Sequence, residues 1–296
     1  MRIHIKPRRF LLCIGACIFA ASTSAARAED VEVALRPAVR VLLEDLHNQS
    51  RISDNGNFGQ PCVKRVLTEE GAVVDCTMNE LKAGNDGQRR LTMAFLRKYD
   101  LVISHGRYNG TAPCGAAPGS VLKNYKTPQI VEVFADDEIK ALRDYIAEGG
   151  FVLAISGGGT LGYGCGLPLY NPLLRPFGVE VDNVKSEGLG APSLPRDREH
   201  PLLHDIDALF PVFPTTLTVT NPAAIHLAFL KDKPLLTTVP HGLGWLIVLG
   251  GGSGWMNQGM DNPKLQERAG QNRQLLRNLV GWVSVAGSIN KPSRKG

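Results

Sequence analysis

The chain has no excess of either charge once its first 28 residues are set aside. Those residues carry five basic side chains and no acidic one. Removing the five from the 33 Lys and Arg of the whole chain leaves 28, which equals its 28 Asp and Glu. Nucleic-acid binding relies on a basic surface that displaces counterions, so this balance excludes the simplest electrostatic argument for a nucleic-acid partner. It also removes the simplest argument for an anionic membrane surface.

Long apolar runs are missing as well, because no stretch beyond residue 28 reaches 18 consecutive apolar residues. Before that point, a basic segment ending at Arg9 is followed by twelve apolar residues, 10–21, and by Ala-Arg-Ala at 26–28. Twelve residues are too few to cross a bilayer, and this order is typical of a signal peptide, residues 1–28, cleaved before Glu29. A retained anchor and lipidation at Cys17 are the alternatives. We expect a periplasmic or secreted protein with no stable membrane insertion after signal removal.

The sequence contains no C-x-x-C pair, which argues against a structural zinc site. The cysteines beyond the signal peptide are Cys62, Cys76, Cys114 and Cys165. An even number in an oxidising compartment predicts disulfides, and four cysteines allow three pairings.

Short apolar runs alternate with amphipathic stretches along the chain. Strands are predicted at residues 39–43, 72–76, 101–104 and 151–155, and later at 217–219, 224–229, 235–239 and 245–249. Helices are predicted at residues 62–70, 91–99, 136–149 and 272–285. Continuous apolar strands that alternate with helices are typical of a parallel sheet covered on both faces. The later strands have short connections, which are typical of a mixed or antiparallel extension.

This pattern predicts an α/β fold with a doubly wound, mainly parallel sheet and a mixed or antiparallel C-terminal extension. We expect one domain over residues 29–288, followed by a disordered basic tail at 289–296. Residues 106–134 show no sustained period, and a connection of that length is typical of a functional loop such as a lid. The loops that follow parallel strands share one edge of the sheet. That placement favours the disulfides Cys62–Cys76 and Cys114–Cys165.

Seven segments of the chain together resemble the class I glutamine amidotransferase-like superfamily. They are residues 41–48, 99–104, 135–150, 171–179, 200–202, 244–250 and 272–282. Within the superfamily, the chain is most similar to a flavodoxin-like family related to gliding-motility accessory proteins, and more distantly to the trehalose-utilisation type. The resemblance implies a flavodoxin-like sheet in a single amidotransferase-like domain and says little about a reaction.

The catalytic residues of true glutamine amidotransferases are missing from the matching positions. That superfamily carries a Cys on a tight turn after a strand and a His-x-Glu near the end. Here Ser156 stands in place of the cysteine, and neither His226 nor His241 begins a His-x-Glu. We therefore expect no glutaminase activity, because a fold can be kept without its chemistry. Ser156 remains a candidate nucleophile, although its flanks are not a G-x-S-x-G elbow; the alternative is a small residue at a tight turn.

Polar residues follow several predicted strands, and ligands bind at the carboxyl ends of strands in doubly wound sheets. The predicted ligand-binding residues are Asp45, His47, His105, Gly157, Trp255 and Asn257. Trp255 supplies a flat apolar surface and Asn257 an amide, which together suit a small polar molecule. Trp255 could equally cover the end of the sheet, and the alternative for Asp45 and His47 is that they cap loops and hydrogen-bond the backbone.

Two functions of different class follow from these residues. The preferred one is a non-catalytic ligand-binding or scaffold domain without a cofactor, whose partner is a small polar ligand or an envelope protein. The alternative is a periplasmic hydrolase that uses Ser156, or a metal held by Asp45 with histidines such as His105 or His241.

Overall fold

The computed structural model describes a defined part of the chain. The described residues are 38–44, 46, 61–81, 89–106, 121–122, 129–130, 134–156, 167–182, 191–195, 199–212, 214–251, 253–255, 257–260 and 266–290. Every described residue belongs to one compact unit, residues 37–296. Among the described residues, no helix is long and apolar enough to cross a membrane.

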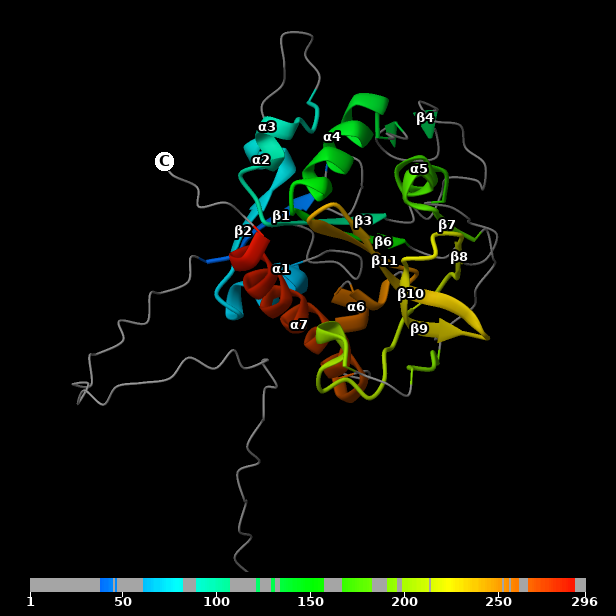
Figure 1. The fold of residues 1–296 in the computed structure, drawn as a ribbon. Helices are drawn as coiled ribbons and strands as arrows, with labels where there is room; N and C mark the ends of the chain where they lie inside the picture. Colours follow the sequence, from blue (N-terminus) through cyan, green and yellow to red (C-terminus); the bar gives the residue numbers. More distant parts are fainter. Residues whose placement is uncertain are drawn as a thin grey trace, which may run out of the picture. The chain divides into compact units, whose positions relative to one another are not determined.

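A seven-stranded sheet forms the centre of this unit (Figure 1). Its strands are, in spatial order, β2 (Val73–Cys76), β1 (Arg40–Glu44), β3 (Leu101–Gly106), β6 (Phe151–Ser156), β11 (Gly244–Leu249), β10 (Lys233–His241) and β9 (Ile225–Leu230). The first five are parallel, whereas β10 runs antiparallel to both of its neighbours. The prediction of a flavodoxin-like, mainly parallel sheet with an antiparallel C-terminal extension is therefore confirmed.

Helices cover both faces of the sheet. One face packs against α1 (Pro61–Glu69), α6 (Asn257–Met260) and α7 (Gln266–Asn290), and the other against α3 (Met93–Leu96), α4 (Asp136–Ala147) and α5 (Leu167–Leu174) (Figure 1). The remaining elements are α2 (Thr77–Glu80), β4 (Val121–Leu122), β5 (Gln129–Ile130), η1 (Arg175–Phe177), β7 (Val179–Val181), η2 (Pro201–Leu203), β8 (Leu217–Val219) and η3 (Ser253–Trp255).

Alternation along the strands divides the core into two clusters. Leu43 and Ile103 point to the α1–α7 side, whereas Leu42 and Val102 point to the α4–α5 side. Successive side chains of a strand face opposite ways, so strands covered on both sides must be apolar at every position. This explains why these strands appear in the sequence as continuous apolar runs.

The helix predicted at 136–149 is confirmed as α4. Its buried Glu138 accepts hydrogen bonds from Ala135 N at 3.0 Å and from Leu91 N at 2.8 Å. One carboxylate thus satisfies an amide at the start of α4 and ties the helix to the segment before α3. At the other end, a Cβ on Gly244 would meet the carbonyl oxygen of Ile146, so β11 can begin against α4 only with glycine there.

Two predicted elements differ from the structure. The strand predicted at 217–219 is β8, but it pairs with β7 in a separate two-stranded sheet. The helix predicted at 91–99 is only the four-residue α3, which Thr92 caps by accepting a hydrogen bond from Phe95 N at 3.3 Å.

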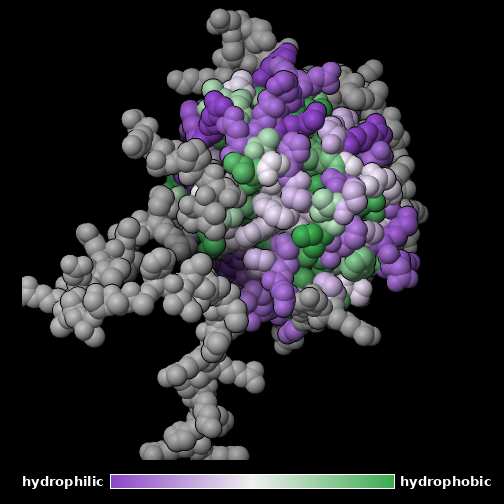
Figure 2. Space-filling model, viewed as in Figure 1, coloured by the Kyte–Doolittle hydropathy of each residue, from purple (hydrophilic) through white to green (hydrophobic). Residues whose placement is uncertain are grey.

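On the face of the molecule seen in Figure 2, hydrophilic and hydrophobic residues are interspersed.

Candidate functional site

The chain reverses its direction across the sheet between β1 and β3. From β1 it passes to β2 on one side, and then to β3 on the other. In open α/β sheets, ligands bind beyond the carboxyl ends of the strands at such a switch point. Glu44, the last residue of β1, lies there as the register partner of Ser104 in β3. The side chains around this pair form the candidate site.

A chain of three buried polar side chains marks the switch point. Ser104 Oγ donates to Glu44 Oε2 at 2.8 Å and lies 2.9 Å from Tyr170 Oη. The other carboxylate oxygen, Glu44 Oε1, accepts from Leu46 N at 2.8 Å. All three side chains are at most 2% exposed. A buried carboxylate is costly unless it is hydrogen-bonded, and here both of its oxygens are.

The direction of each hydrogen bond among Glu44, Ser104 and Tyr170 follows from the donors and acceptors that these side chains have. A serine hydroxyl has a single proton, and Ser104 uses it in the hydrogen bond to the carboxylate of Glu44. In the hydrogen bond between Ser104 and Tyr170, the donor must therefore be the hydroxyl of Tyr170. Burial, and secondly the charge of Glu44, raise the pKa of Tyr170 above its usual value, which keeps this phenol protonated. The lone pairs of Tyr170 Oη remain able to accept a hydrogen bond.

Packing of α5 holds Tyr170 in place. The neighbouring Asn171 accepts from Val181 N at 2.8 Å and donates to Val181 O at 3.3 Å, which ties α5 to β7. The ring of Tyr170 meets that of Phe134 edge-on, with 6.2 Å between the centroids. Because α5 also packs against β6, Tyr170 lies on the side of the sheet to which Ser156 points.

Ser156 ends β6 on the same face as Glu44 and Ser104. Ala154 is the register partner of Ser104, and Ser156 lies two residues further along, so the Cα atoms of Ser104 and Ser156 are about 8 Å apart. Its side chain is 1% exposed, and its Oγ makes no hydrogen bond within the described part of the chain. A buried hydroxyl without a partner is uncommon and calls for an explanation.

His105 lies on the opposite face of the sheet from Ser156. Its register partner is Ile155, whose side chain belongs to the core cluster under α1 and α7. Residues adjacent in sequence on a strand point to opposite sides, so the buried His105 cannot reach Ser156. The structure therefore separates two residues that the sequence placed in one pocket.

His241 lies at the other edge of the sheet. It ends the antiparallel strand β10 and pairs with Gly244, the first residue of β11, and its ring packs on Phe177 at 5.1 Å. A metal site shared by His105 and His241 is therefore not assembled. Within the described ranges, no group of three or more His, Cys, Asp or Glu is arranged to hold a metal ion.

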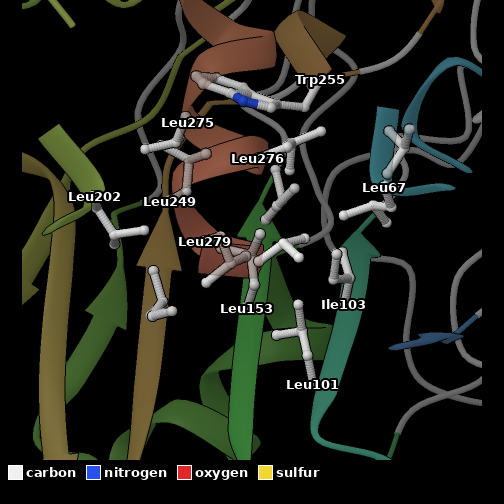
Figure 3. Close-up of a cluster of buried hydrophobic side chains, with 14 of the residues drawn as sticks. Leu67, Leu101, Ile103, Leu153, Leu202, Leu249, Trp255, Leu275, Leu276 and Leu279 are labelled. Carbon is white, nitrogen blue, oxygen red and sulfur yellow. The ribbon is translucent and has the colours of Figure 1, made fainter. Parts of the chain in front are cut away.

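Trp255 is part of the core rather than of an open surface. Its side chain is 0% exposed and lies above Leu275 and Leu276 of α7 (Figure 3). Asn272 holds the preceding turn by donating to Gly254 O at 2.9 Å and to Phe210 O at 3.0 Å. Of the two roles considered for Trp255, the structure corresponds to covering the end of the sheet.

Other predicted site residues fall outside what the structure describes. Asp45, His47 and Gly157 are not among the described residues, and only the backbone of Asn257 is. Their assignment to the site stays a prediction.

The two predicted disulfides have different outcomes. Cys62 and Cys76 are both buried and are not joined to each other; Cys62 Sγ instead lies 3.9 Å from Met260 Sδ of α6. The thiol of Cys62 thus packs toward α6, whereas Cys76 ends the edge strand β2. Cys114 and Cys165 lie outside the described residues, so their pairing stays a prediction.

Sequence reasoning missed Glu44, Ser104 and Tyr170. The first two carried a signal, since each is a polar residue at the end of an apolar strand. Tyr170 carried none, because only the packing of α5 brings it to Ser104.

Comparisons with known proteins show the fold alone. No family model and no curated protein matches the chain. Among solved structures, the mmIFT52 N-terminal domain is 18% identical with a TM-score of 0.55, covering 83% of this chain and 97% of that one. The cytoplasmic protein STM1381 from Salmonella typhimurium LT2 is 17% identical with a TM-score of 0.50, covering 85% and 99%. A protein described as ThuA-like from Bacteroides uniformis is 14% identical with a TM-score of 0.49, covering 86% and 95%.

Proposed function

We propose that this protein is an exported, non-catalytic ligand-binding or scaffold domain with an amidotransferase-like fold. Its ligand would lie at the carboxyl edge of the sheet, beside Glu44, Ser104, Tyr170 and Ser156. The switch-point position supports this location, because open α/β sheets bind their ligands there. The relation to the gliding-motility and trehalose-utilisation families belongs to the same proposal.

The surroundings of Ser156 carry the non-catalytic part of the proposal. A serine nucleophile needs a base within hydrogen-bond reach, and Ser156 Oγ has no hydrogen-bond partner among the described residues. His105 faces away from it. His226 does share its face, but it lies on β9, three strands or roughly 14 Å away, and bonds with Thr237 at 3.0 Å.

Labelling with a fluorophosphonate probe tests this part directly. We expect Ser156 in the purified mature protein to react no more than the background that a Ser156→Ala variant defines. Stoichiometric labelling of Ser156, lost in the variant, would overturn the proposal and establish the hydrolase alternative. Elemental analysis of the same preparation tests the metal version of that alternative, because a bound transition metal at one per chain would support it.

Export is tested separately from binding. N-terminal sequencing of protein recovered from the periplasm should begin at or near Glu29. An intact Met1, or an acylated Cys17, would contradict cleavage of the predicted signal peptide and leave the binding proposal untouched.

A further inference from the structure

We propose that the edge of the sheet at which the parallel strands begin rests on the surface of an anionic lipid bilayer. At this edge the turn between β10 and β11 lies beside the start of β6, and the second half of α7 packs on it. The candidate ligand site lies at the opposite edge, where the strands end. The two surfaces are therefore independent, and both can be occupied at once.

The second half of α7 carries no charge. Its first twelve residues, 266–277, include four charged side chains, whereas its last thirteen, 278–290, include none. Gly281 and Val285 are exposed on this half, and Val285 is 48% exposed. A helix on the surface of a globular protein normally turns charged or polar side chains to water. An uncharged outer face with an exposed valine therefore favours contact with something other than water.

The turn between β10 and β11 presents a leucine to solvent. Gly242 and Leu243 form this two-residue turn, and Leu243 is 51% exposed, more than any other large apolar residue of the described chain. Glycine, asparagine and aspartate are the usual residues of such turns. Leu243 N donates to Ala147 O at 3.0 Å, and a Cβ on Gly242 would meet the backbone of Ala147. The end of α4 thus holds this exposed leucine in a fixed position.

Two half-buried tryptophans connect the turn with α7. Trp245 follows Leu243 by two residues, and its ring centroid lies 5.2 Å from that of Trp282. Trp282 also meets Phe151, the first residue of β6, at 5.1 Å, and precedes Val285 by about one helical turn. Tryptophan is enriched where hydrocarbon meets water, because its ring is apolar and its N–H is polar. Leu243, Trp245, Trp282 and Val285 together form the apolar edge patch.

The apolar edge patch has no fixed charge of its own, and a neighbouring carboxylate is paired. Glu148, which follows Ala147 at the end of α4, binds Arg97 at 2.6 Å. The ring of His200 packs on Trp282 at 4.9 Å, and burial lowers the pKa of His200 to about 4, which leaves it neutral at neutral pH. These groups therefore bring no net charge to the patch.

A basic segment follows the uncharged half of α7. Residues 291–296 contain two lysines and one arginine and no acidic residue. Anionic headgroups attract such residues, and an apolar contact joined to a basic segment supplies the two signals that peripheral membrane binding needs. The neutrality of the chain beyond residue 28 does not oppose this, because only charges within a Debye length of the bilayer, about 10 Å in 0.1 M salt, contribute. A second copy of the chain would bring two basic segments together, and their repulsion disfavours it as the occupant.

The patch is suited to lie on a bilayer rather than to cross it. Thirteen helical residues are about 20 Å long, whereas the hydrocarbon core is about 30 Å thick. Leu279 and Val283, on the inner face of the same half of α7, belong to the core cluster and hold the helix on the sheet. Only the exposed side chains, Leu243 and Val285 first, can therefore enter the interface.

Flotation with lipid vesicles tests the proposal on the exported mature protein. The probes are vesicles of phosphatidylglycerol and phosphatidylcholine in equal amounts, and vesicles of phosphatidylcholine alone, both in 0.1 M NaCl. We expect the protein to float with the anionic vesicles and to bind the neutral ones at least tenfold more weakly, a difference of about 1.4 kcal/mol. Raising the salt to 0.5 M should weaken the binding to the anionic vesicles, because the headgroup charges are screened.

Three variants assign the binding to this edge. Val285→Glu, Leu243→Glu, and replacement of the three basic residues of 291–296 by glutamine should each weaken binding to the anionic vesicles at least tenfold. Asn79→Glu is the matched control, because it adds the same charge at an exposed residue of α2, which follows β2 at the opposite edge of the sheet. Its binding should equal that of the wild type. Val285→Ser and Leu243→Ser replace the glutamate variants if either of those fails to fold.

The outcomes separate this proposal from the proposed function. Absence of binding to the anionic vesicles, equal binding to the neutral ones, or binding unchanged by the substitutions at both Val285 and Leu243 would overturn it. Sedimentation velocity without lipid tests the other occupant: a wild-type dimer that Leu243→Glu dissociates would make the patch a dimer interface and overturn membrane binding. Labelling of Ser156 by a fluorophosphonate bears on the proposed function alone.

Discussion

Glu44 and Ser104 are register partners across β1 and β3, and a 2.8 Å hydrogen bond from Ser104 Oγ to Glu44 Oε2 joins their side chains. This bond lies where the chain changes direction across the sheet, so it joins the two strands that define the switch point. Tyr170 extends the same network onto α5. Removing the hydroxyl of Ser104 should therefore take a hydrogen-bond partner from both Glu44 and Tyr170.

Ser104→Ala should lower the free energy of unfolding by about 1–3 kcal/mol, because it leaves a buried carboxylate short of one donor. Tyr170→Phe should cost less, about 1 kcal/mol, and the two losses should be less than additive because Tyr170 bonds to Ser104. Urea unfolding of the two single variants and of the Ser104→Ala/Tyr170→Phe double variant measures these losses. Thr68→Ala is the control, because its hydroxyl bonds to Lys64 O on an exposed helix surface and its loss should cost under about 0.5 kcal/mol. Equal effects of Ser104→Ala and Thr68→Ala would contradict the network.

Trp255→Ala should destabilise the protein by about 3–5 kcal/mol, the range for removing a large aromatic side chain from a core. The reason is that Trp255 is fully buried against Leu275 and Leu276. Thermal or urea unfolding of the purified variant gives the measurement. If the variant unfolds like the wild type but loses ligand binding, the ring is a ligand surface, and the core assignment is wrong.

His200 should make the stability depend on pH. Burial lowers the pKa of His200 from 6.5 to about 4, and its Nδ1 accepts from Leu202 N at 3.2 Å at the start of η2. Because the folded pKa is the lower one, the unfolded chain takes up the proton first as the pH falls. Stability present above about pH 6.5 is therefore lost as the pH falls from there towards 4.

His200→Asn tests this dependence, because asparagine keeps an N-cap acceptor and cannot titrate. Between pH 7 and pH 5, the wild type should lose about 1 kcal/mol more than the variant in urea unfolding, a value reduced from the full shift because the ring is partly exposed. If the free energy of unfolding of the two proteins depends on pH in the same way, protonation of His200 does not contribute to the pH dependence of stability.

The sheet could be predicted from the sequence because its central strands are buried on both faces. Such strands are apolar along their length, as in residues 151–155 of β6, and no tertiary information is needed to find them. The strand β7 was not predicted, and β8 pairs with it outside the main sheet. With three residues, β7 is too short to show a period in the sequence.

The candidate site was harder to predict because it depends on strand register. His105 and Ser156 each follow an apolar run, and this placement alone predicts that both line one pocket. Their strands pair Gly106 with Ser156 and His105 with Ile155, and this offset of one residue places the two side chains on opposite faces. Strand register and the packing of α5 are set by the tertiary structure. The hydrogen bond between Tyr170 and Ser104 therefore could not be predicted from the spacing of residues in the sequence.

Ser156→Ala should leave the ligand-free protein as stable as the wild type, or more stable by about 0.5–1 kcal/mol. The substitution removes a buried hydroxyl that makes no hydrogen bond with the described residues, so it relieves a desolvation cost and breaks no bond. Thr238→Val should behave in the same way, for the same reason, on the other face of the sheet. Urea unfolding without ligand measures both variants. Ser104→Ala, which breaks two hydrogen bonds, should change the stability in the opposite direction.

Binding sites often keep residues that lower the stability of the ligand-free protein. A gain in stability from Ser156→Ala, together with lost affinity, would therefore identify Ser156 as a ligand contact. A loss of more than about 1 kcal/mol would instead show that Ser156 is needed for the turn after β6.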